Sequence, residues 1–305
     1  MKQKFFTLAA VATMFAACTQ SDEVINPEIP QESPMTVTAE VDEMGETRAG
    51  FDANNLPTTF YLTVTQAEDG SAYNYTNVKM TKGEGSNYTP SQTLAWKDAS
   101  SRSPFVSAYT INGTEVFVAT DQTTAENVKA NDLLGAAKAS GSTSNDVTIN
   151  GDQITINFRH LLCKLDVTYN WGGEFANSSS KSIMSVEYQG FGTSATLTPT
   201  TAAVTASTTG TIQGYVNGST SEAIFAPLSS SPKLKIIAMI DNVERTFVMN
   251  VTAPTDGFAQ GNRYTMNVTI GGAIAQTGEI TISKGWETGD ANGTTDGTTG
   301  NMTTN

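Results

Sequence analysis

Apolar residues recur at every second position along much of the chain, which is the spacing of half-buried β-strands. In the clearest case Met35, Val37, Ala39 and Val41 share one face, and polar residues occupy the positions between them. Comparable runs predict strands at 59–66, 104–110, 114–120, 147–158, 161–169, 193–200, 233–240, 245–252, 263–270 and 278–283. Only residues 125–138 suggest a helical turn. Short strands separated by clusters of Gly, Asn and Ser predict an all-β fold of sandwich type.

The N-terminus predicts export. Lys2 and Lys4 precede an uncharged, largely apolar run that ends at Ala17, which is too short to span a bilayer and has signal-peptide length. Cys18 follows directly, and the stretch resembles a bacterial lipoprotein signal, although Phe15 stands where leucine is usual. That resemblance implies cleavage before Cys18 and lipid on its sulfur and new amine. An ordinary secretory signal with an incidental cysteine is the alternative.

The chain carries 17 basic and 30 acidic residues, a formal charge of -13, which becomes -15 once Lys2 and Lys4 leave with the signal. An acidic surface repels phosphate backbones, so we expect no nucleic-acid partner. If Cys18 carries lipid, Cys163 is the remaining cysteine and no internal disulfide is expected.

The length allows one large or two ordinary domains. We predict a signal peptide at 1–17, a leader at 18–48, and two β-sandwich domains at 49–156 and 157–288. Residues 289–305 have almost no apolar content, which predicts a disordered tail.

Catalytic chemistry is not indicated. If residues 160–169 formed one strand, Cys163 would point into the core and His160 away from it, which excludes a local Cys–His dyad. We therefore expect a buried Cys163 and a structural His160. No spacing of His, Cys or carboxylates indicates a metal, and no nucleophile elbow is present. The sequence predicts no enzyme and no cofactor.

Tryptophan offers one candidate ligand contact. Trp171 lies in a loop-like segment and is the best candidate for an exposed side chain that stacks on a sugar. A tryptophan of a sandwich more often belongs to the core, and that alternative stays open.

Several landmarks occur in a specific order. They are the segment Glu46 to Phe51, Trp96 before a strand, the Asp-Leu-Leu segment in 131–138, the Phe-x-His strand in 154–169, the Gly-x-x-Tyr strand in 258–270, and a closing strand with Trp286. In this order the chain resembles the fimbrillin family, which comprises pilus subunits and anchored surface lipoproteins of Gram-negative anaerobes. The resemblance implies two transthyretin-like β-sandwiches in tandem.

The resemblance also implies a mode of assembly. A sandwich that lacks one strand has an apolar groove, which a strand from another fimbrial subunit can fill. Met35 to Val41, here termed the plug strand, would occupy that groove until a protease cuts the Arg48–Ala49 bond. A plain first strand, with Arg48 in an ordinary loop, is the alternative.

The predicted function is that of a fimbrial subunit in cell adhesion, held to outer-membrane lipid through Cys18. Ser21 to Glu23 resembles the export tag of surface lipoproteins, which implies a surface-exposed location. The tail after Trp286 lacks alternating apolar residues and cannot be a donor strand. Either residues 273–286 are themselves mobile enough to donate, or the chain is a tip or accessory subunit that accepts a strand and gives none, which we favour. The alternative is a monomeric surface lipoprotein that binds a glycan or a host or bacterial surface protein through its loops.

Overall fold

The structure is a computed structural model that describes residues 32–41, 50–66, 72–98, 101–271 and 274–284. Strands dominate it, and the predicted all-β fold is confirmed. Within these residues the one α-helix is α1 (Ala125–Ala130), inside the stretch for which a helical turn is predicted. The hydroxyl of Thr124 caps its N-terminus by accepting a hydrogen bond from the Asn127 amide.

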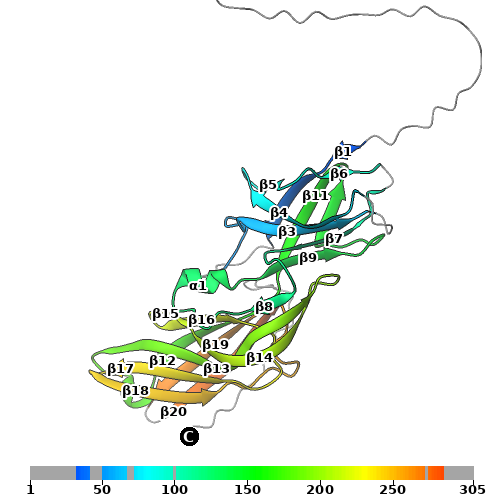
Figure 1. Cartoon of the computed structure of the whole chain (residues 1–305). Helices are drawn as coiled ribbons and strands as arrows, with labels where there is room; N and C mark the ends of the chain where they lie inside the picture. The colour runs from blue at the N-terminus through cyan, green and yellow to red at the C-terminus, as the bar shows by residue number, and fades with distance from the viewer. Residues whose placement is uncertain (1–31, 42–49, 67–71, 99–100, 272–273, 285–305) are drawn as a thin grey trace, which may run out of the picture.

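The first sheet curls around its own hydrophobic core. Its order is β10-β11-β2-β5-β4-β3-β7-β9, and β11 also pairs with β9 at Arg159 and His160, so seven of the strands form a closed ring. The strands are β2 (Thr36–Val41), β3 (Thr59–Thr65), β4 (Tyr75–Lys82), β5 (Asn87–Pro90), β7 (Phe105–Tyr109), β9 (Leu134–Lys138), β10 (Val147–Asn150) and β11 (Gln153–His160). A short sheet of β1 (Ser33–Pro34) and β6 (Ala95–Trp96) lies at one end (Figure 1).

Two further sheets enclose a second core. One has the order β15-β16-β12-β19-β20, and the other has the order β14-β13-β17-β18 with β8 beside β13. The bounds are β8 (Glu115–Phe117), β12 (Cys163–Trp171), β13 (Lys181–Thr198), β14 (Ala203–Gln213), β15 (Tyr215–Asn217), β16 (Thr220–Phe225), β17 (Lys233–Ile240), β18 (Val243–Asn250), β19 (Asn262–Gly271) and β20 (Ile274–Lys284). A 3-10 turn, η2 (Gly173–Phe175), follows β12.

Two separate clusters of buried apolar side chains fill these two parts. The chain passes from one to the other between the end of β11 at His160 and the start of β12 at Cys163. Earlier residues also reach the second core, because Val116 of β8 and Val128 of α1 are buried in it. Figure 1 accordingly shows α1 and β8 where the two parts meet. The domain bounds given above stay predictions.

The second part also buries a group of charges. Lys164 Nζ lies 2.7 Å from Glu222 Oε2 and 3.7 Å from Asp166 Oδ1, and Arg263 Nε lies 2.5 Å from Asp166 Oδ2. Burial raises the pKa of Glu222, and the ammonium of Lys164 opposes that rise. Two cations and two carboxylates thus balance across β16, β12 and β19.

Candidate functional site

The plug strand lies inside the first sheet. Its β2 portion runs parallel to β11 and antiparallel to β5, so it has a neighbour on each side. Met35, Val37, Ala39 and Val41 are all buried, as the alternation predicts for their faces. Burying these side chains contributes roughly 5–10 kcal/mol as an upper figure, which is comparable with the net stability of a whole domain, about 5–15 kcal/mol.

Backbone hydrogen bonds also hold this strand along its length. The amides of Met35, Thr36 and Ala39 donate to Leu94 O, Asp152 O and Ser86 O at 3.0, 3.0 and 2.9 Å. On the opposite face the hydroxyls of Thr38 and Thr155 lie 3.1 Å apart. Removing the strand would therefore expose apolar side chains and unpaired backbone groups together.

Three aromatic rings from β3, β5 and β11 lie in the same core as the plug strand. The Phe60 ring of β3 meets Tyr88 of β5 at 4.7 Å and Phe158 of β11 at 5.1 Å between centroids, both edge to face. The Tyr88 hydroxyl donates to Pro57 O at 2.6 Å, and burial raises its pKa to about 12. The rings thus join the two strands that flank β2 to a strand on the far side of the core.

A polar cluster around Ser33 lies just before the plug strand. Ser33 Oγ donates to Asp152 Oδ1 at 2.7 Å and accepts from Arg102 Nη2 at 3.0 Å. Arg102 Nη2 also lies 2.6 Å from Asp152 Oδ1, and its guanidinium stacks over the buried Trp96 ring at 5.5 Å. The bond from Ser33 is the main cause that lowers the pKa of the Asp152 carboxyl, so this cluster favours the ionised acid.

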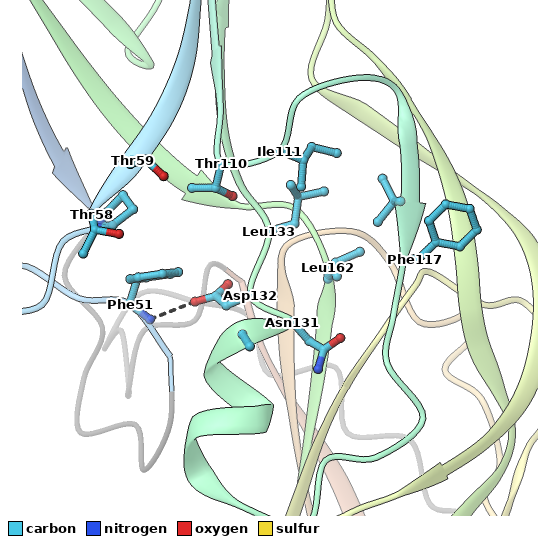
Figure 2. Close-up of a pocket in the computed structure, with 13 residues that line it drawn as sticks. Phe51, Thr58, Thr59, Thr110, Ile111, Phe117, Asn131, Asp132, Leu133 and Leu162 are labelled. Carbon is cyan, nitrogen blue, oxygen red and sulfur yellow. Dashed lines mark hydrogen bonds between the residues drawn. The ribbon is translucent and has the colours of Figure 1, made fainter. Parts of the chain in front are cut away.

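A pocket lies where the two cores meet (Figure 2). It has a volume of about 200 Å³, and Asp132 is at its wall. Asp132 Oδ2 accepts from the Phe51 amide at 2.8 Å, and its Oδ1 lies 2.8 Å from His160 Nδ1. Lys129 Nζ lies 4.9 Å above the Phe51 ring. These contacts anchor the chain three residues after Arg48.

The predicted orientation of His160 is wrong. It closes β11 and is buried against Asp132, whereas Cys163 opens β12 and donates from Sγ to Ala259 O at 3.1 Å. Leu161 and Leu162 belong to neither strand, so the alternation of side-chain directions in β11 does not continue into β12. Cys163 is buried as expected, and burial raises the pKa of its thiol.

A sequence model of the fimbrillin-like family matches residues 47–286, more than three quarters of the chain. The chain belongs to the fimbrillin-like family. No curated protein sequence matches it.

Solved structures share the fimbrillin-like fold. A candidate cell adhesion protein from Bacteroides uniformis is 23% identical with a TM-score of 0.56, covering 83% of this chain and 97% of that one. A second from Bacteroides ovatus is 16% identical with a TM-score of 0.58, covering 84% of this chain and 98% of that one.

Other predicted sites of this fimbrillin-like chain fall as follows. Trp171 ends β12, where it is half-buried and packs against the second core. Cys18, Arg48 and Ala49 lie outside the described residues. Within the described part no group of three or more His, Cys, Asp or Glu side chains could hold a metal ion. Among its helices, none is long and apolar enough to cross a membrane.

Sequence reasoning missed the partners of the plug strand. Ser33, Arg102 and Asp152 are far apart in sequence, and nothing in their local patterns indicates that they meet. Phe60 and Phe158 fall on the apolar faces of predicted strands, so their burial could be predicted. The contact between their aromatic rings across the first core could not.

Proposed function

We propose that this chain is a fimbrial subunit that serves cell adhesion. In this proposal it is exported as a lipoprotein through Cys18, cleaved after Arg48, and joined to other fimbrial subunits by donor-strand exchange at the outer membrane surface. The observation that carries the proposal is the plug strand, which has strand neighbours on both sides while its connection to residue 50 includes Arg48.

The family membership and the solved neighbours support the same role. The neighbours from Bacteroides uniformis and Bacteroides ovatus are described as candidate cell adhesion proteins, and the matching family is fimbrillin-like. A fimbrial subunit acts through its assembly and needs no catalytic group, which agrees with the expectation of a non-enzyme.

A tip or accessory position is proposed for the subunit. β20 pairs with β19 from Ile274 to Lys284 and forms one end of a sheet over the second core. In this proposal β20 stays in its own sheet, and the subunit accepts a strand and gives none.

Cleavage tests the proposal directly. Treating the purified full chain with an arginine-specific protease should cut after Arg48 and release the plug strand, so that the cut chain takes up an added peptide of residues 32–42. An Arg48→Gln variant is the matched control and should take up no peptide under the same treatment. A wild-type product cut at Arg48 that takes up no peptide would contradict strand exchange. It would favour the monomeric binding protein instead, for which Trp171→Ala is the variant to test.

A further inference from the structure

Two aromatic residues on the neighbouring strands pair with the plug strand on either side of Ala39. The position that the plug strand occupies between β5 and β11 is termed the groove. Val37 pairs with Tyr88 on one neighbouring strand, and Val41 pairs with Phe158 on the other. Phe60 contacts both of these rings from across the core. The side chain between the two valines is Ala39, which is fully buried. Ala39, which pairs with Ile156, thus presents a single methyl group between the two positions that pair with aromatic residues.

Ser33, two residues before the plug strand, lies in a polar environment. Ser33 lies six residues before Ala39, and its hydroxyl both donates to Asp152 and accepts from Arg102. Arg102 is itself fixed over Trp96. A hydroxyl on a short side chain is matched to both partners, because it can donate and accept at once.

We propose that this groove selects its incoming strand by register. It takes a strand with a hydroxyl residue at the place of Ser33, apolar residues at the places of Met35, Val37 and Val41, and a small residue at the place of Ala39. The proposal rests on the proposed function, since it concerns the strand that replaces the plug strand.

The sequence indicates where such a strand comes from. After residue 41, no run of this chain has Ser or Thr followed by apolar residues at the second, fourth and eighth positions and Ala, Gly or Ser at the sixth. In β20 the residues at alternate positions are Ile274, Gln276, Gly278 and Ile280, which places a glutamine where the groove takes Val37. Residues 33–41 are thus the run of this sequence that fits, and they lie in the leader that cleavage would release, so we expect the partner to be a subunit with a different sequence.

Peptide uptake tests the selection. The full chain is cleaved with the arginine-specific protease, and in urea below the unfolding midpoint it is mixed with a labelled peptide of residues 32–42. Peptide retained by the protein is then measured by native mass spectrometry. Three variant peptides are compared with the parent peptide, namely Ala39→Leu, Ser33→Ala and the matched control Thr36→Leu, whose altered side chain is exposed.

The expected order of uptake follows from packing. Ala39→Leu should bind about 5- to 150-fold more weakly than the parent peptide, because overpacking a core costs about 1–3 kcal/mol. Ser33→Ala should lose about two- to tenfold, and Thr36→Leu should stay within about twofold of the parent. A peptide of residues 274–284 should not be retained.

The failures of the two proposals are distinguishable. Retention of Ala39→Leu as strongly as the parent peptide by the cleaved chain overturns the register selection and leaves strand exchange standing. No retention of any peptide by the cleaved chain overturns strand exchange and the selection together. Uptake by the uncleaved chain equal to that by the cleaved chain contradicts the role of Arg48.

Discussion

Lys164 shows at the scale of one residue how this protein tolerates charge in its interior. Its amino group is fully buried and lies 2.7 Å from Glu222, with Asp166 and Arg263 completing the group. A buried ion pair is weak evidence for stability in itself, but removing one partner leaves the other charge uncompensated.

Lys164→Met should therefore lower the free energy of unfolding by about 3–5 kcal/mol at neutral pH. The penalty should shrink as pH falls, because burial raises the folded pKa of Glu222 and protonation removes the uncompensated charge below that pKa. Urea denaturation followed by circular dichroism at several pH values measures both effects.

Lys235→Met is the matched control for this prediction, since Lys235 pairs with Glu187 at 2.9 Å on a more exposed surface. Its loss should stay below about 1 kcal/mol. A second comparison is Lys164→Met combined with Glu222→Met, which should recover much of the stability. Equal losses for Lys164→Met and Lys235→Met would show that the buried group has no special role.

At the scale of single residues, sequence reasoning succeeded where one uninterrupted strand sets the side, as for Val37 and Val41. It failed for His160, because a break of two residues separates β11 from β12 and the count of alternating sides restarts there. Its partner Asp132 comes from a different segment, so no local pattern could have predicted a buried pair.

The plug strand shows at the scale of elements why position matters more than composition. Its alternation is shared with several other strands, but only pairing with β11 and β5 places it in the interior of a sheet. The sequence also predicts β3, β7, β17 and β19 close to their observed bounds, since each alternates cleanly. It missed β4, β5, β14 and β16, where polar residues interrupt the alternation, and it assigned the residues of β9 to the stretch that suggests a helical turn.

Amide hydrogen exchange should report the departure of the plug strand. After cleavage and removal of the leader, amides of β5 and β11 that face the vacated position should exchange at least about tenfold faster, because they lose their strand partner. Amides of β17 and β18, in the second part, should be unchanged and serve as the internal control. The measurement is exchange mass spectrometry with peptide mapping, and unchanged protection of β5 and β11 would contradict the role of β2 in the sheet.

At the scale of the whole molecule, two cores share one junction. Asp132 lies there, between the Phe51 amide and His160, and the pocket wall combines residues such as Leu133 and Leu162 of the second core with Phe51, which packs against the first. The length allows one or two domains, and two were expected from the resemblance to the fimbrillin family. The junction could not be predicted, because it depends on contacts that cross both parts.

Asp132→Ala should lower the free energy of unfolding by about 1–3 kcal/mol, because a buried amide and a buried imidazole each lose a hydrogen-bond partner. Asp121→Ala is the matched control, since that carboxylate is exposed and bonds only nearby residues. Thermal unfolding of both variants provides the comparison. Equal melting temperatures would show that the junction contributes nothing to stability.

The pairing of β11 with β9 closes the first sheet into a ring, which protects the chain from aggregation as long as β2 stays in place. With β2 in place, each of the seven strands in the ring pairs with a strand on both sides. Removing β2 leaves two unpaired strand edges at once, one on β5 and one on β11. Unpaired edges of this kind favour aggregation with any extended polypeptide nearby. Under the proposed assembly, β2 should therefore leave only when a strand from another subunit is ready to take its place.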